Sequence, residues 1–138
     1  MIAIGVDILE IRRMEQAIAR FGDRLLQRVF TPAERQACRG RVAEYAARFA
    51  AKEAVAKALG VGLRIMAREG IGFHDVEILP DHRGQPHVHL RGWAAERARV
   101  LGLKQWAVSM THDGGFAIAV VASIGGLSSL DLPPEHRS

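Results

Sequence analysis

The first part of the chain changes from an apolar strand pattern to a helical pattern. Residues 2–8 form an almost continuous apolar run, typical of a short buried strand, and Asp7 interrupts the run near its end. From residue 10 to residue 21 the apolar side chains recur at helical spacing, and Gly22 is a natural stop. We therefore expect a strand followed directly by an amphipathic helix.

Two further helices are predicted between residues 31 and 60. The segment 31–34, Thr-Pro-Ala-Glu, combines an N-cap threonine, a proline at the first helical position and a capping-box glutamate. The helix that starts there is expected to break near Gly40. A second helical segment then runs from about residue 42 to Leu59 and is closed by Gly60.

The second half of the chain predicts two hairpins and one more helix. Short strand patterns occupy residues 76–79 and 87–90 on either side of a turn-rich link, and residues 93–101 form a helical pattern. The clearest hairpin signal comes from residues 106–111 and 116–121, which flank His-Asp-Gly-Gly. The expected fold class is α+β: a single domain in which a largely antiparallel sheet packs against a long central helix.

Size and composition also fit one domain. The chain has 138 residues, of which 49% are hydrophobic and 25% charged, and a chain of this length can bury a core of its own. After Ser123 the composition turns to Gly, Ser and Pro, so we expect a domain over residues 1–122 and a flexible tail over residues 123–138. No apolar stretch is long enough for a bilayer and no basic leader follows Met1, so we expect a cytoplasmic protein without membrane contact.

Charge narrows the choice of partners. The net charge of +4 comes mostly from arginines, many of them in the first half of the chain. Such a field attracts anions, including nucleic acid, phosphorylated cofactors and acidic proteins, and arginine binds phosphate oxygens well. Cys38 is the only cysteine, which excludes an internal disulfide and a cysteine metal cluster.

Three charged residues are candidates for chemistry. Glu53 and Lys57 lie four residues apart in an otherwise small, apolar helix, so both can reach one point, although a solvated ion pair explains the same spacing. Lys52 faces another way and could point to solvent. Asp7 could cap the following helix or bind a metal. Beside Glu53, it offers a second hard oxygen ligand for Mg²⁺, which takes one or two protein carboxylates and completes its shell with water and substrate phosphates.

Two segments resemble the signature motifs of a known family. Residues 5–14, Gly-Val-Asp-Ile-Leu-Glu-Ile-Arg-Arg-Met, and residues 48–57, Arg-Phe-Ala-Ala-Lys-Glu-Ala-Val-Ala-Lys, together resemble the two motifs of the phosphopantetheinyl transferases. Their order and separation match as well. The short length, residues 30–34 and residues 108–112, Val-Ser-Met-Thr-His, are similar to the small bacterial type of this family, which modifies acyl carrier protein. The resemblance covers residues 1 to about 122.

The resemblance implies an enzyme that transfers the 4′-phosphopantetheine arm of coenzyme A to a serine of apo acyl carrier protein. It implies Mg²⁺ dependence, release of adenosine 3′,5′-bisphosphate and a place in fatty acid biosynthesis. Asp7 and Glu53 would bind Mg²⁺, and Lys57 would neutralise charge on the phosphate or protonate the departing phosphate. The serine proton could pass to Glu53, to Asp7 or to a water on the metal, and we favour Glu53.

The resemblance assigns further residues to coenzyme A. Arg48 would contact the 3′-phosphate of the nucleotide, although a surface helix charge is the plain alternative. Five other positions would approach the cofactor backbone, its adenine end or its phosphates: Gly60 and Gly62 after the central helix, Gly84 and Pro86 in a turn, and His112 near the end of the domain. A helix cap, an ordinary turn and a packing histidine are the plain structural alternatives for these positions.

The basic first helix would bind the acidic carrier protein. Arg13 aligns with an arginine by which the family docks its carrier, with Arg20 and Arg24 as helpers. Complementary charge would mainly speed encounter and set orientation. The resemblance also implies a homotrimer whose active sites lie between subunits.

Two other functions fit parts of the sequence. A nucleic-acid-binding module would explain the arginines but leaves Asp7, Glu53 and Lys57 unused, and no nucleic-acid motif with interleaved aromatics is visible. We therefore expect no nucleic-acid partner. A Mg²⁺-dependent hydrolase of the pyrophosphate in coenzyme A would use the same acidic residues and would need no carrier protein.

Overall fold

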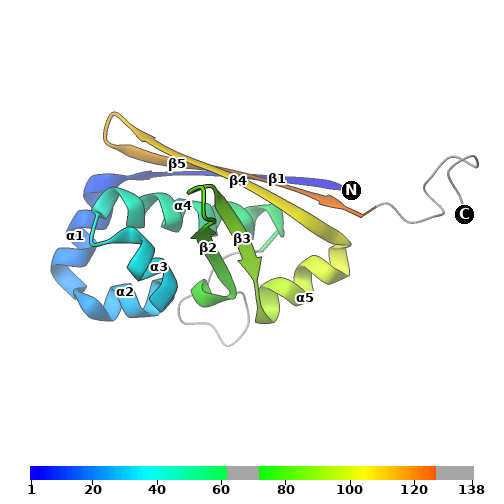
Figure 1. Ribbon diagram of the computed structural model, residues 1–138, viewed down its shortest axis with the longest axis horizontal. Helices are drawn as coiled ribbons and strands as arrows, with labels where there is room; N and C mark the ends of the chain where they lie inside the picture. Colours follow the sequence, from blue (N-terminus) through cyan, green and yellow to red (C-terminus); the bar gives the residue numbers. More distant parts are fainter. Residues whose placement is uncertain (62–71, 127–138) are drawn as a thin grey trace, which may run out of the picture.

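The computed structural model describes residues 1–61 and 72–126, which form an α+β fold as the sequence predicts (Figure 1). None of the helices in these two ranges is long and apolar enough to span a membrane. Along the chain the elements are β1 (Ile2–Glu10), α1 (Ile11–Phe21), α2 (Asp23–Val29), α3 (Pro32–Cys38), α4 (Val42–Ala58), the 3₁₀ turn η1 (Phe73–Asp75), β2 (Val76–Pro80), β3 (Pro86–Leu90), α5 (Gly92–Leu101), β4 (Leu103–Asp113) and β5 (Phe116–Gly125).

The larger sheet is antiparallel, with the strand order β1-β5-β4. Strands β4 and β5 join through Gly114 and Gly115, whose positive φ angles of 57° and 84° suit a tight hairpin turn. The turn is shorter than the predicted four residues, because His112 and Asp113 still pair in β4. Strand β5 continues to Gly125, beyond the predicted domain boundary, and residues 127–138 of the predicted tail lie outside the described residues.

Helix α4 lies along one face of this sheet, and the other helices lie on the same side (Figure 1). Alanine side chains on α4, including Ala50 and Ala54, are fully buried and allow the helix to approach β1 closely. At Gly5 the approach is so close that a Cβ atom would lie 1.8 Å from the carbonyl oxygen of Ala54. A residue without a side chain is therefore required at this point of β1.

The helices before α4 are partly as predicted. Helix α1 ends at Phe21 before Gly22, and the capping box at the start of α3 is present: Glu34 N donates to Thr31 Oγ1 at 3.2 Å and Thr31 N donates to Glu34 Oε1 at 3.0 Å. Helix α2 was not predicted as a separate helix, because its few apolar positions continue the pattern of α1. Gly22, with φ 59°, separates the two helices.

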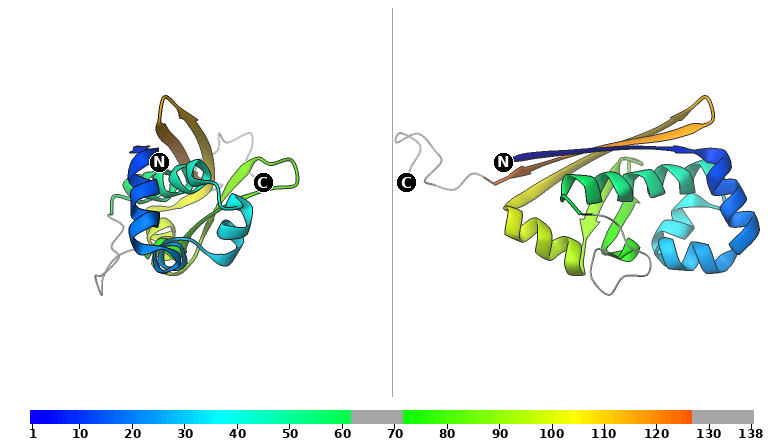
Figure 2. Two further views of the ribbon diagram at one scale, coloured as in Figure 1. Left: turned by 90° about the vertical axis from the view of Figure 1, so that its left-hand side faces the viewer. Right: turned by 180° about the vertical axis from the view of Figure 1, so that it is seen from behind.

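A second, two-stranded sheet is formed by β2 and β3, whose register places Pro80 opposite Pro86. Its turn extends away from the rest of the chain in the left view of Figure 2. Helix α5 follows and ends at Gly102, where φ is 74°. The predicted first hairpin and the helix after it are therefore both confirmed.

Candidate active site

Strand β1 and helix α4 bring Asp7, Glu53 and Lys57 together. Lys57 Nζ lies 2.9 Å from Asp7 Oδ1 and also donates to the carbonyl oxygen of Val6 at 3.0 Å. Asp7 does not cap the following helix, since the N-cap of α1 is Glu10 and that helix has no side-chain cap. Asp7 and Lys57 are 50 positions apart in the sequence, yet they are in contact. Each belongs to one of the two segments that resemble the family motifs.

The electrostatics of the three groups are coupled. Burial raises the pKa of Glu53, and the neighbouring Asp7 carboxylate raises it further, while Lys57 acts in the opposite direction. The hydrogen bond from Lys57 to Asp7, followed by the charge of that carboxylate, raises the pKa of the lysine. The carboxylates of Asp7 and Glu53 therefore repel one another, an arrangement that a cation stabilises.

The donor set fits Mg²⁺. Asp7 and Glu53 offer hard carboxylate oxygens, and over residues 1–61 and 72–126 no group of three or more His, Cys, Asp or Glu side chains gathers as a zinc-type site would require. Mg²⁺ keeps several of its own waters and takes only one or two protein carboxylates. Asp7 and Glu53 are therefore the residues that could hold the ion, with open positions left for a substrate.

Arg48 lies on another side of α4 from the acidic pair. Its side chain is buried, Nη1 lies 2.7 Å from Glu44 Oε2, and Nε donates to the carbonyl oxygen of Ile78 at 3.3 Å. Arg48 and Glu53 are five positions apart, which turns their side chains about 140° apart on a helix. The structure joins Arg48 to β2 and does not place it beside Lys57.

The other predicted cofactor residues lie on several different elements. Gly60, with φ 72°, directly follows α4, and Gly84, with φ 82°, lies in the turn that leads to Pro86. His112 pairs with Ala117 in the sheet, in a register that puts it on the same face as Asp7. Gly62 lies outside the described residues.

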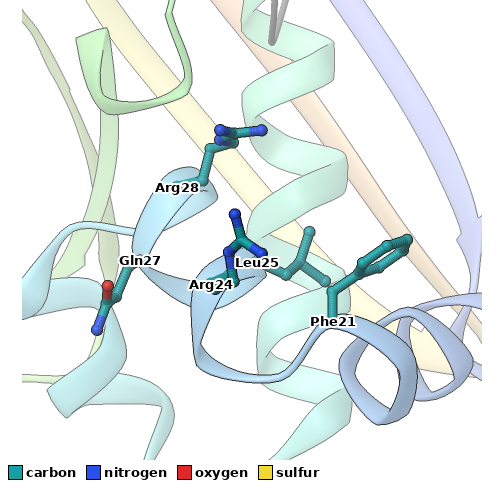
Figure 3. Close-up of a pocket in the computed structure, with 5 residues that line it drawn as sticks. All are labelled: Phe21, Arg24, Leu25, Gln27 and Arg28. Atoms are coloured by element: carbon teal, nitrogen blue, oxygen red, sulfur yellow. The ribbon is translucent and has the colours of Figure 1, made fainter.

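One of the predicted docking arginines, Arg24, borders a hollow that is lined by the end of α1 and by α2. Figure 3 shows the five residues that line it, and its volume is about 670 Å³. Arg20 stacks its guanidinium 5.1 Å from the centre of the Phe21 ring, next to this hollow, and Arg13 is exposed on α1. The lining residues are Phe21, Arg24, Leu25, Gln27 and Arg28. Basic and apolar groups thus occur together on this surface.

Sequence reasoning missed two features of the structure. Lys52 does not point to solvent: it is fully buried and paired with Glu34, which no local pattern indicates. A second hollow of about 590 Å³ between α3 and β2 is bordered by Arg39 and Arg41, next to Pro80. Two arginines around the glycine at the helix break were the available signal for this hollow.

Comparison with known proteins places this geometry in a family. The profile of the 4′-phosphopantetheinyl transferase superfamily matches residues 3–121. The chain belongs to this superfamily. The match spans both motifs and every strand of the larger sheet, and it confirms the resemblance and the class of enzyme predicted from the sequence.

Several similar proteins carry the same name. A holo-[acyl-carrier-protein] synthase of Herpetosiphon aurantiacus is 44% identical over 127 residues, covering 91% of this chain and 100% of that protein. One from Roseiflexus castenholzii is 54% identical over 104 residues, covering 75% of this chain and 76% of that protein. The crystal structure of Helicobacter pylori holo-[acyl-carrier-protein] synthase in complex with coenzyme A is 35% identical with a TM-score of 0.77, covering 88% of this chain and 99% of that chain.

Proposed function

We propose that this transferase moves the 4′-phosphopantetheine arm of coenzyme A to a serine of apo acyl carrier protein. The observation that carries the proposal is the cluster of Asp7, Glu53 and Lys57, which combines two hard oxygen ligands with an exposed ammonium. The names of the relatives and the coenzyme A complex of the Helicobacter protein support the same substrates. We further propose that the reaction serves fatty acid biosynthesis, and location in the cytoplasm stays a prediction from the sequence.

Asp7 and Glu53 would hold Mg²⁺ against the pyrophosphate of coenzyme A. Bound there, the ion would neutralise charge on the phosphate oxygens as the bridging bond breaks. Lys57 is suited to follow the phosphate, because its side chain is 55% exposed and only an ion pair and one carbonyl contact hold it at Asp7. It would then neutralise or protonate the departing phosphate.

In the proposed reaction the serine oxygen forms a bond to the phosphorus that carries the pantetheine arm. The bridging phosphorus–oxygen bond breaks, and adenosine 3′,5′-bisphosphate leaves. Glu53 would accept the serine proton, since Asp7 is already engaged by Lys57, whereas no ion pair or side-chain hydrogen bond joins Glu53 to another described residue.

The nucleotide end of coenzyme A would lie toward the β2–β3 turn. Pro80 borders the hollow that contains Arg39 and Arg41, and it pairs with Pro86, so a cationic surface lies beside the predicted adenine turn at Gly84. Two arginines suit a phosphate on the nucleotide. We retain Gly60, Gly62 and His112 as contacts nearer the pyrophosphate and Arg48 as a contact of the 3′-phosphate.

The hollow between α1 and α2 would receive the acidic carrier protein. Arg13, Arg20 and Arg24 supply positive charge at this end of the molecule, and Phe21 and Leu25 supply an apolar surface beside them. Charge complementarity would orient the carrier and speed its encounter with the enzyme.

A homotrimer with sites between subunits is the proposed assembly. The face of the larger sheet opposite α4 has no helix over it (Figure 1), and it exposes large apolar side chains from two strands. These are Ile2, Ile4, Val6 and Ile8 on β1, with exposed fractions of 54–72%, and Val120 and Ile124 on β5, with 44% and 43%. An apolar surface of this kind is typical of a protein–protein interface, and further copies of the chain would cover it.

Mass spectrometry of the carrier protein tests the proposed function. The chain is incubated with coenzyme A, Mg²⁺ and apo carrier protein, and we expect the mass of the carrier to increase by one phosphopantetheine. Glu53→Gln and Asp7→Asn should each lower the rate about 100-fold or more with the fold intact, because each removes a carboxylate that would hold the ion that neutralises the pyrophosphate. Glu96→Gln, an exposed carboxylate change on α5 and away from the proposed docking helix, is the matched control.

Each alternative gives a different result in the same assay. Several apo carriers that all remain unmodified would contradict the transferase proposal. Cleavage of coenzyme A without any carrier would instead indicate a hydrolase. Near-normal transfer by Glu53→Gln or Asp7→Asn across Mg²⁺ concentrations would refute the proposed metal role of that residue.

A further inference from the structure

A fully buried lysine precedes Glu53 on α4. The side chains of Lys52 and Glu34 are both 0% exposed, and Lys52 Nζ lies 2.8 Å from Glu34 Oε1. The same ammonium donates to the carbonyl oxygen of Phe73 at 2.8 Å and to that of Val76. Its three N–H groups therefore have three oxygen partners, on α3, η1 and β2.

Glu34 is equally well bonded. Besides Lys52, its carboxylate accepts hydrogen bonds from the backbone N–H of Thr31 at 3.0 Å and from that of Ile78 at 2.9 Å. These bonds tie the start of α3 to the middle of β2. The ammonium of Lys52 thus enters a rigid framework made by elements other than its own helix.

The network continues to the surface through one more carboxylate. Thr31 Oγ1 donates to Glu77 Oε2 at 2.6 Å, and Arg91 Nη2 donates to Glu77 Oε1 at 2.7 Å. Every charged member of this chain of contacts has a partner of opposite charge. The buried pair of Lys52 and Glu34 is therefore fixed in place by contacts of both of its members.

Stability alone does not account for such a pair. A buried ion pair loses the hydration of both charges, and an apolar pair of similar volume is often at least as stable. The effect of the pair on the rotation of α4 is more specific. Around Lys52 the core side of α4 presents small side chains, including the fully buried Ala46, Ala50 and Ala51, and small side chains form shallow ridges that determine the rotation of a helix weakly.

The rotation of α4 decides where Glu53 points. Successive residues are about 100° apart around a helix, so a fixed direction for Lys52 fixes the direction of Glu53, and Lys57 follows on the same face one turn later. With side chains extending about 5–6 Å from the axis, a rotation of about 20° moves a carboxylate by roughly 2 Å. Mg²⁺ requires oxygen distances of about 2.0–2.1 Å in near-octahedral geometry. A shift of that size would disrupt shared binding by Asp7 and Glu53.

We propose that Lys52 is a positioning residue for the metal site: its buried contacts with Glu34, Phe73 and Val76 hold α4 in the rotation that directs Glu53 toward Asp7. This inference rests on the proposed metal-binding role of Asp7 and Glu53. It does not require Lys52 to touch substrate, metal or coenzyme A.

The double variant Glu34→Gln with Lys52→Met tests the proposal. It removes both buried charges together and keeps the approximate volumes, so neither charge is left unpaired and the fold should be retained. The probe is Mn²⁺ alone, with the free ion measured by electron paramagnetic resonance. We expect the dissociation constant for Mn²⁺ to rise about 10-fold or more, the range found when groups that orient metal ligands are replaced.

A kinetic measurement separates positioning from a general loss of structure. The Mg²⁺ concentration needed for half-maximal transfer should rise in the double variant, while KM for coenzyme A stays near the wild-type value. The matched control is Glu96→Gln with Arg99→Met, the same chemical change at an exposed ion pair of α5, which should leave Mn²⁺ affinity unchanged.

The outcomes are distinct. A folded double variant with wild-type Mn²⁺ affinity would overturn the role of Lys52. If the double variant does not fold, Lys52→Met alone, which removes all three contacts of the ammonium, is titrated in the same way, and wild-type affinity there would overturn the role equally. Failure of the wild type to bind Mn²⁺ would refute the proposed metal site itself. Binding that is lost in Asp7→Asn but kept in the double variant would refute only the positioning role.

Discussion

Replacement of Gly5 by alanine is the most direct test of the contact between β1 and α4. The added Cβ would lie 1.8 Å from the carbonyl oxygen of Ala54, 2.8 Å from its carbonyl carbon and 3.1 Å from the backbone nitrogen of Ala58. All three atoms belong to the helix backbone, so no side chain can rotate to make room. The strand or the helix must move instead.

The cost follows from the size of this movement. Carbon–oxygen contacts under 3.0 Å are essentially absent from real structures, so the two elements must separate by about 1 Å. Overpacking of a core typically costs about 1–3 kcal/mol, and a clash between two backbones should reach about 3 kcal/mol. For a domain of this size that loss should lower Tm by about 10 °C. Asp7, two residues along β1, would move away from α4 at the same time.

Urea unfolding followed by tryptophan fluorescence and circular dichroism measures the loss. The matched control is Gly72→Ala, because Gly72 has φ −74° and the nearest atom to its added Cβ would be Asp75 Oδ2 at 3.8 Å. That variant should be unchanged, or stabilised by about 0.4–1 kcal/mol through reduced entropy of the unfolded chain. A Gly5→Ala variant as stable as the wild type, with an unchanged slope in urea, would refute the close-contact argument.

Two further predictions concern buried groups of the same core. Burial raises the pKa of Cys38 to about 11 despite the opposing charge of Arg48, so iodoacetamide at pH 8 should label the thiol only after unfolding in urea; rapid labelling of the native protein, read by mass spectrometry, would contradict its burial. Burial also raises the pKa of Glu77, but hydrogen bonds from Thr31 and Arg91 outweigh this effect and hold the pKa below the ordinary value of 4.5. The stability that these bonds contribute is therefore present above pH 4.5 and is lost as the pH falls through the lowered folded-state pKa, so Glu77→Gln should flatten the acid side of a stability curve from urea unfolding at several pH values. An equally steep acid limb in the variant would show that Glu77 is not responsible.

Local signals in the sequence predicted those elements whose ends are encoded within a few residues. The capping box at Thr31 and Glu34, the helix over residues 93–101 and the hairpin at Gly114 depend on neighbours in sequence, and all are present in the fold. Helix α2 escaped prediction because only a change of direction at Gly22 separates it from α1, and the apolar spacing continues across that point.

The resemblance to the family motifs predicted the acidic site, which residue spacing alone could not do. Glu53 and Lys57 were indistinguishable from a surface ion pair within their own helix, and the structure shows that Lys57 pairs with Asp7 on a different element. Partners 50 positions apart leave no local pattern, so their contact could be expected only from the resemblance and not from periodicity.

By itself, the sequence determined the α+β class, most of the elements, the family and the choice of Asp7 and Glu53 as a pair. Only the tertiary structure decided which charged residues of α4 are buried. Lys52 and Arg48 look like solvated helix charges in sequence, yet α3, η1 and β2 cover them and provide their partners. The physical reason is that burial of a charge depends on oxygen partners supplied by distant segments, and the sequence of one helix contains no information about where those segments pack.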